Sequence, residues 1–274
     1  MNPNGIMRSL VLAINTATLI FLLAPFAIVV VFAINPTNYV EFPPVGVSLV
    51  WFRKFFESSE FIDALLYSLQ IAAVATVLSA VLGASGALAI NRTNLPGKQA
   101  MIAIFLSPLM IPTILTGLGL FQMFLLLDVG RPAWGIILGH TVVCIPYVIR
   151  TTLAVLEGFD RRLEEAALNL GAGPVKTFFE VTLPNISPGV AAGAVFAFVI
   201  SFDQVPISLF LVEPGRETFP IRMFNYLLYN FDGAIAAASI VSMAISLGLV
   251  FATDRIFGLQ LVASSTSAHR KEPS

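Results

Sequence analysis

Residues 9–40 have the sequence SLVLAINTATLIFLLAPFAIVVVFAINPTNYV, in which no side chain is charged. A helix of about 20 apolar residues is long enough to cross the roughly 30 Å hydrocarbon core of a membrane. The apolar core of the stretch, residues 10–34, greatly exceeds the roughly 7–15 apolar residues of a cleaved signal peptide, and only Arg8 supplies a positive charge before it. We therefore expect a retained transmembrane helix.

Five further uncharged runs follow, each long enough to span a membrane as a helix. They lie between Asp63 and Arg92, Lys98 and Asp128, Arg131 and Arg150, Glu180 and Asp203, and Asp232 and Asp254. The sequence therefore predicts an all-α integral membrane protein with six transmembrane helices. We expect the fifth helix to continue past Asp203 through residues 204–212.

The composition agrees with this class. Hydrophobic residues make up 57% of the 274 residues and charged residues 11%, and the mean hydropathy is +0.88, whereas a soluble domain carries about 25% charged residues. A net charge of -1 gives no indication of nucleic-acid binding. One cysteine, Cys144, and two histidines, His140 and His269, form no disulfide framework and no metal-binding pattern. We expect no metal and no cofactor, and a packed, hydrogen-bonded His140 rather than a proton relay.

The distribution of lysine and arginine predicts the orientation of the six helices. With the N-terminus in the cytoplasm, ten positive residues lie inside: Arg8, Arg92, Lys98, Arg150, Arg161, Arg162, Lys176, Arg255, Arg270 and Lys271. Five lie outside: Arg53, Lys54, Arg131, Arg216 and Arg222. The positive-inside rule therefore favours both termini in the cytoplasm.

Three segments are expected along the chain. Residues 1–62 hold the N-terminal helix and a periplasmic segment, residues 63–257 form the main transmembrane domain, and residues 258–274 form a disordered cytoplasmic tail. Small residues are dense at 83–87 and 191–194, which allows helices to approach one another closely.

The connection between the fourth and fifth spans differs from the others because it alternates polar and apolar residues. Glu164 and Glu165 stand near the start of a short predicted helix, where the helix dipole favours acidic side chains. Gly171 is suited to end that helix and Pro174 to begin a second one. We expect Pro184 to end the second helix.

The second helix is predicted to be amphipathic, with one apolar face made by Val175, Phe178, Phe179 and Leu183. Two short helices joined by a glycine turn form a rigid elbow, and residues 161–184 are called the elbow below. The alternative interpretation of such a segment is an ordinary amphipathic helix lying on the membrane surface.

The elbow resembles the EAA loop of the permeases of binding-protein-dependent ATP-binding-cassette importers. The matching residues are Glu165, Ala166, Ala167, Gly171, Val181, Leu183 and Pro184, and the one departure is Val181, where isoleucine is usual. The likeness extends from about residue 65 to 257 and includes residues 67–92, YSLQIAAVATVLSAVLGASGALAINR. It implies the type I importer permease fold and a cytoplasmic coupling loop at residues 157–186 that docks on an ATPase.

Asp203 is an acidic residue in an otherwise apolar segment. Together with Gln204 it stands in a segment similar to that of spermidine/putrescine-type permeases, which carry an acidic or acidic–polar pair there. A carboxylate within a membrane faces a cavity or a partner, so Asp203 and Gln204 are candidates for a pathway that favours a cationic solute. The alternative is structural: Asp203 pairs with Arg216 or Arg222, or caps a break at Pro206.

The resemblance implies a permease subunit of a bacterial inner-membrane importer, with a polyamine as the favoured solute. Its implied partners are a second, different permease chain, two cytoplasmic ATPase subunits and a periplasmic or lipid-anchored solute-binding protein. The chain contains no G-x-x-x-x-G-K-[ST] phosphate loop, so we expect it not to be an enzyme. Opines, sugars, anions or iron chelates remain alternative solutes. An ion-gradient-driven transporter and a membrane enzyme are alternative classes, but the first would need more intramembrane ionisable residues and the second a catalytic cluster.

Overall fold

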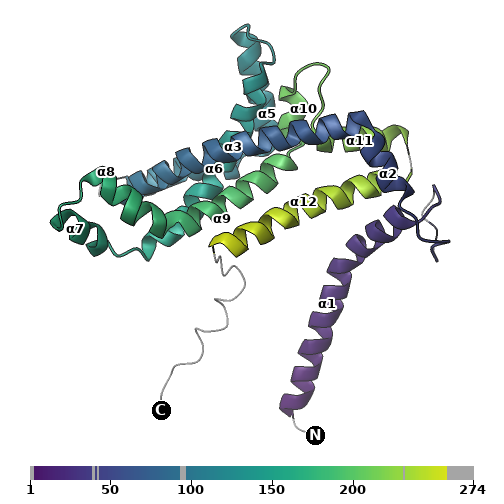
Figure 1. The fold of residues 1–274 in the computed structure, drawn as a ribbon, viewed down its shortest axis with the longest axis horizontal. Helices are drawn as coiled ribbons and strands as arrows, with labels where there is room; N and C mark the ends of the chain where they lie inside the picture. The colour runs from purple at the N-terminus through teal and green to yellow at the C-terminus, as the bar shows by residue number, and fades with distance from the viewer. Residues whose placement is uncertain (1–2, 39–40, 42, 93–96, 231, 258–274) are drawn as a thin grey trace. The chain divides into compact units, whose positions relative to one another are not determined.

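The computed structural model describes residues 3–38, 41, 43–92, 97–230 and 232–257, and all regular elements within these ranges are helices (Figure 1). The predicted tail at 258–274 lies outside the described residues. In chain order the elements are α1 (Pro3–Ile34), α2 (Val50–Glu57), α3 (Ser59–Arg92), α4 (Lys98–Leu106), η1 (Ser107–Leu109), α5 (Thr113–Leu126), α6 (Ala133–Glu157), α7 (Arg162–Asn169), α8 (Pro174–Thr177), η2 (Phe178–Thr182), α9 (Leu183–Phe202), α10 (Pro206–Leu211), α11 (Phe219–Tyr229) and α12 (Ala234–Phe257).

Among the described residues, five single helices are long and apolar enough to cross a membrane. They are Met7–Ile34, Ser59–Arg92, Ala133–Glu157, Pro174–Phe202 and Ala234–Ile256. The predicted third span is not one straight helix, because Lys98–Leu109 and Thr113–Leu126 meet at an angle of 91°. Pro108 and Pro112 flank the break, and proline removes a backbone donor and clashes with the preceding turn. If this bent pair is taken as one membrane span, the number of spans is six.

The chain divides into two compact units. Unit 1 comprises residues 1–62 and 223–245, and unit 2 comprises residues 63–222 and 246–274. In unit 1, the Trp51 indole donates a hydrogen bond to the Asn35 carbonyl oxygen over 2.7 Å, and Lys54 forms an ion pair of 2.6 Å with Asp232. Gly233 lies directly against Trp51, since an added Cβ would be 2.4 Å from its Cδ1 atom. These contacts join α2 to the residue after α1 and to the two residues that precede α12.

In unit 2, α6 packs against α9 along much of its length. A Cβ atom added at Gly193 of α9 would lie 2.6 Å from the Cα atom of Val148 in α6, and one added at Gly189 would lie 2.9 Å from the Thr151 carbonyl oxygen. Gly83 of α3 also lies against α6, with 2.7 Å between its added Cβ and the Cβ of Val148. The small-residue runs therefore do allow close helix packing, as predicted.

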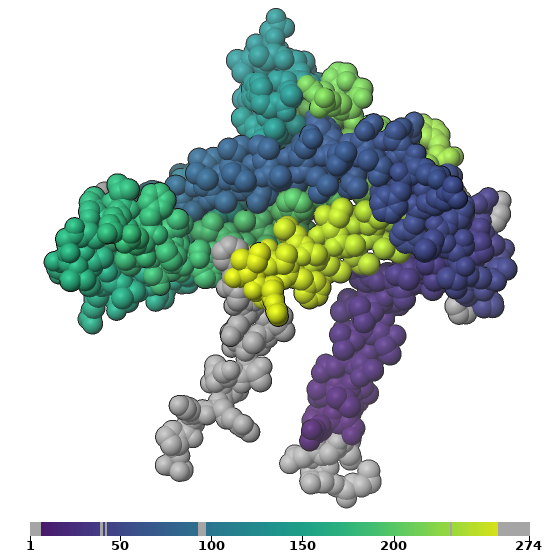
Figure 2. Space-filling model, in the orientation of Figure 1, coloured from purple at the N-terminus to yellow at the C-terminus, as the bar shows by residue number. Residues whose placement is uncertain are grey.

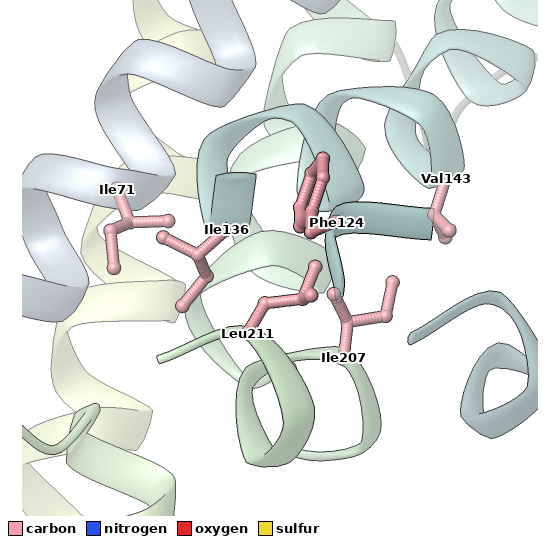
Figure 3. Close-up of a cluster of buried hydrophobic side chains, with 6 residues drawn as sticks. All are labelled: Ile71, Phe124, Ile136, Val143, Ile207 and Leu211. Carbon is pink, nitrogen blue, oxygen red and sulfur yellow. The ribbon is translucent and has the colours of Figure 1, made fainter. Parts of the chain in front are cut away.

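In the N-terminal half of α6, a cluster of buried apolar side chains joins four helices (Figure 3). It consists of Ile71 from α3, Phe124 from α5, Ile136 and Val143 from α6, and Ile207 and Leu211 from α10. Figure 1 shows α5 and α10 beside each other in this part of the unit. The cluster fixes α10, and with it the break between α9 and α10, against α6.

Candidate coupling elbow and pathway residues

The elbow begins with α7, whose predicted acidic start is confirmed. Glu164 and Glu165 both lie in its first turn, where they interact favourably with the helix dipole. The carboxylate of Asp160 accepts a hydrogen bond of 3.0 Å from the Arg162 backbone N–H. This bond supplies a partner for one of the helix's unpaired N-terminal donors.

The predicted glycine turn at the end of α7 is also confirmed. Gly171 has a φ of +90°, a left-handed conformation that disfavours side chains with a Cβ atom. Its N–H donates to the Leu168 carbonyl, and the Ala172 N–H donates to the Ala167 carbonyl, both over 3.0 Å. This pair of bonds is a Schellman motif. It makes residue 171 a position where replacement of glycine introduces strain.

Pro184 does not end the second helix, contrary to the prediction. Helical structure begins at Pro174, the predicted first helical position, and continues without interruption to Phe202. Immediately before Pro184 the helix widens into a π-helical turn, η2. Such a turn changes the hydrogen-bond register, so a proline that donates no bond is accommodated without a break. The second helix of the elbow and the fifth span are therefore parts of one helical segment of 29 residues.

Several apolar side chains of the elbow are exposed: Leu163 (48%), Leu168 (48%), Leu170 (89%), Val175 (70%) and Phe179 (60%). The predicted single apolar face is thus divided, because Phe178 and Leu183 are half-buried and Leu183 packs on the cluster that contains Ile149 and Ile186. Figure 2 shows the elbow, in green, as a projection at one end of unit 2. Large exposed apolar side chains gathered on one projection are typical of a surface that binds another protein.

The residues of the EAA match occupy two environments within the elbow. Glu165, Ala166, Gly171 and Pro184 are exposed, whereas Ala167, Val181 and Leu183 are half-buried. The exposed members are available to a partner, and the half-buried members hold the shape of the elbow.

Glu164 has a structural environment that the sequence did not predict. Its Oε1 atom forms an ion pair of 2.6 Å with Nη2 of Arg92, the last residue of α3, and also accepts a hydrogen bond from the Thr182 hydroxyl. Nearby, Nη2 of Arg161 donates to the backbone oxygen of Asn91 over 2.7 Å and to its side-chain oxygen over 2.9 Å. Glu164 and its partners Arg92 and Thr182 lie far apart in the chain. The one sequence signal for Glu164 is its position next to Glu165.

At its other end α9 stops at Phe202, and the expected continuation of the fifth helix past Asp203 is wrong. Residues 203–205 separate α9 from α10, because Pro206 at the start of α10 cannot continue the ladder of backbone bonds. Asp203 is exposed at this break, and its side chain forms no ion pair with any residue that the structure describes. Arg216 pairs instead with Glu213 at 3.7 Å, and Arg222 with Glu217 at 3.6 Å.

A buried polar network lies next to Asp203. The ring nitrogens of His140 are 2.8 Å from the Ser201 hydroxyl and 3.0 Å from the Ser208 hydroxyl, and Ser208 donates to the Gln204 backbone oxygen over 2.6 Å. His140 is 2% exposed, which confirms the prediction of a packed, hydrogen-bonded histidine. The side-chain nitrogen of Gln204 is buried and has no partner among the described residues. Those residues also contain no cluster of three metal-ligating side chains.

The two candidate sites therefore lie at opposite ends of α9. Its 20 residues, at about 1.5 Å per residue, separate the elbow from Asp203 by about 30 Å. When a helix moves as a rigid body, a displacement at one end also moves the other end.

Residues 79–259 match the family described as binding-protein-dependent transport system inner membrane component. The chain is 31% identical over 230 residues to the spermidine/putrescine transport system permease protein PotC of Haemophilus influenzae, covering 84% of this chain and 89% of that one. It is 34% identical over 212 residues to the putrescine transport system permease protein PotI of Escherichia coli, covering 75% of each chain.

Among solved structures, the fold is similar to that of a chain in a bacterial ABC transporter involved in the import of the acidic polysaccharide alginate. The TM-score is 0.66 at 16% sequence identity, over 92% of this chain and 95% of the other.

Proposed function

Because the chain belongs to the family of binding-protein-dependent transport system inner membrane components, the permeases of ATP-binding-cassette importers, we propose that it imports a polyamine or a related small cation. Within the importer it forms half of the translocation pathway, and the other half comes from a second, different permease chain. Two cytoplasmic ATPase subunits bind the elbows, and a periplasmic or lipid-anchored binding protein delivers the solute.

One observation carries the coupling role: the second helix of the elbow and the fifth span form a continuous helix that runs from Pro174 to Phe202. A force on the exposed side chains of Val175 and Phe179 therefore acts directly on the residues beside Asp203. The helix is unbroken along this path and contains the π-helical turn η2 and Pro188. This arrangement supports alternating access driven by a separate motor subunit.

Two observations support a cationic solute. Both bacterial relatives named above carry polyamine transport in their names, at 31% and 34% identity. Asp203 is an exposed carboxylate without an ion pair among the described residues, so its charge is available to attract a cation. Gln204, whose amide nitrogen is unpaired within the described chain, stands beside it as a second candidate contact for the solute.

The fold alone does not restrict the charge of the solute. A chain with the same fold belongs to a transporter involved in the import of an acidic polysaccharide. An opine, sugar, anion or iron chelate is therefore the second candidate for the solute.

Uptake of labelled putrescine and spermidine into proteoliposomes that hold the complete transporter tests the solute. We expect ATP-dependent uptake of at least one of them, and a drop of about tenfold or more for Asp203→Asn, by the scale of a lost hydrogen bond to a charged group. Glu57→Gln is a matched control, since it removes a carboxylate from an exposed ion pair of α2. Uptake of neither polyamine, with uptake of a sugar or an anion instead, would remove the polyamine proposal and leave the permease role intact.

Exchange of Glu165 for lysine tests the docking role. The variant should insert normally but should not co-purify with the ATPase subunits, because the reversed charge stands on the exposed side of the elbow. Normal transport by this variant would argue against docking through the elbow.

A further inference from the structure

Chain connectivity links the elbow to only two of the membrane-spanning helices. The elbow is joined to the end of α6 by residues 158–160, and its second helix continues directly into α9. The third long helix of this unit, α3, reaches the elbow through side-chain contacts. Since α7 itself buries none of its eight residues, apolar packing contributes little to its position, and its polar contacts decide where it lies.

The carboxylate of Glu164 joins three elements at one point. Its Oε1 atom is bonded both to the guanidinium of Arg92 at the end of α3 and to the hydroxyl of Thr182 in η2. The Glu164 side chain is 18% exposed and that of Arg92 is 47% exposed. Loss of either bond therefore leaves a largely buried carboxylate short of a partner, which is more costly than the loss of a surface ion pair.

A second connection reinforces the first. Arg161, at the start of α7, donates to the backbone oxygen of Asn91, one of the terminal α3 carbonyls that have no partner within the helix. A cation at that position also interacts favourably with the helix dipole. The elbow is thus fastened to the last two residues of α3 by two arginines, one from each element.

From these contacts we propose that Glu164 is a positioning residue that makes α3 move together with the elbow and α9. The inference rests on the proposed coupling function and adds a task for Glu164 that differs from that of its neighbour. Glu165 is exposed toward a partner, whereas Glu164 points into the protein and fastens the elbow to α3. Because Gly83 of α3 and Gly193 of α9 both lie against α6, the three helices then tilt as one body.

The test compares wild type with Glu164→Gln in the complete reconstituted transporter. ATP hydrolysis and co-purification of the ATPase subunits should persist in the variant, while the amount of solute transported per ATP falls about threefold or more, within the range found for coupling mutations. The charge exchange Arg92→Glu with Glu164→Arg should restore at least half of that loss. Glu57→Gln, in an exposed pair elsewhere, should leave the ratio unchanged.

A second measurement does not depend on the ATPase. Spin labels are placed at Val81→Cys on α3 and at Leu170→Cys on the elbow, both exposed positions, in a Cys144→Ala background. The measurement gives the distribution of distances between the two labels. Glu164→Gln should broaden that distribution, and the charge exchange should narrow it again.

The outcomes separate the two proposals. If the wild-type chain neither binds an ATPase nor supports ATP-dependent uptake, the proposed function is wrong. If wild type transports but Glu164→Gln keeps both the normal transport ratio and the narrow distance distribution, only the role of Glu164 is wrong.

Discussion

Replacement of Gly193 with alanine should force α6 and α9 apart. The added Cβ atom would lie 2.5 Å from the Thr151 hydroxyl, 2.6 Å from the Val148 Cα atom and 3.2 Å from the Val148 Cβ atom. Non-bonded carbon atoms are normally about 3.5–4.0 Å apart. The two helix axes must therefore separate by about 1 Å, because a backbone Cα atom cannot rotate out of the way as the end of a side chain can.

The size of the effect follows from two opposing terms. Overpacking of this kind costs about 1–3 kcal/mol, whereas alanine is about 1 kcal/mol more favourable than glycine within a helix. The two terms leave a net loss of about 0–2 kcal/mol relative to wild type, and of about 1–3 kcal/mol relative to a glycine-to-alanine change that meets no neighbour. For a chain of this size the second difference corresponds to a melting temperature about 2 to 12 °C below that of such a control.

Thermal unfolding of the detergent-solubilised transporter measures this fall, and two glycines serve as matched controls. Alanine at Gly119 of α5 or Gly248 of α12 would meet no heavy atom within 4 Å, so both controls should match or slightly exceed the wild-type melting temperature. If Gly193→Ala and Gly248→Ala gave equal melting temperatures, the close approach of α6 and α9 would be refuted.

Three further predictions concern other contacts. Gly233→Ala should displace the Trp51 indole, whose Cδ1 atom would be 2.4 Å from the new Cβ, and lower the melting temperature by several degrees; an unchanged value would contradict this packing. Hydrogen bonding to Asp232 raises the pKa of Lys54 above its usual value of 10.5, so the pair should add stability below about pH 10 and lose it as the pH rises through that raised pKa. Between pH 8 and 11 the melting temperature of Lys54→Met should therefore fall less steeply with pH than that of wild type. Equal slopes would count against the pair. His140→Ala should cost about 1–3 kcal/mol, because the buried Ser201 hydroxyl loses its bond to the ring and Ser208 keeps only its bond to Gln204; chemical denaturation that gave wild-type stability would contradict this.

The transmembrane helices could be predicted because hydrophobicity is a local property of the sequence. An uncharged run such as residues 9–40 can span a membrane whatever surrounds it. The bend of 91° between α4 and α5 could not be predicted. The prolines near it were visible, but their effect on direction depends on which neighbouring helices replace the lost backbone bonds.

Local rules predicted the glycine turn of the elbow correctly and the end of its second helix incorrectly. Gly171 has the left-handed conformation that a helix terminus favours. Pro184 follows a π-helical turn that accommodates it, and a single proline does not reveal that turn in advance. At Asp203 the opposite error occurred, because hydrophobicity suggested a continuous helix where Pro206 begins a new one.

The contacts of Glu164 lay beyond sequence reasoning for a different reason. Its partners Arg92 and Thr182 are 72 and 18 residues away, and no periodic pattern joins positions so far apart. Only the folded chain brings them together.

Crosslinking from the elbow to an ATPase subunit tests the central claim most directly. Cys144 is the single cysteine of the chain, so a Cys144→Ala background with Val175→Cys, a site 70% exposed on the elbow, carries one accessible thiol. A Val47→Cys control, 82% exposed in the segment before α2, should react with a membrane-impermeant reagent added outside. The account predicts that Val175→Cys is protected from that reagent and crosslinks to the ATPase subunit. Labelling of Val175→Cys from outside, or the absence of any crosslink in an assembled transporter, would contradict it.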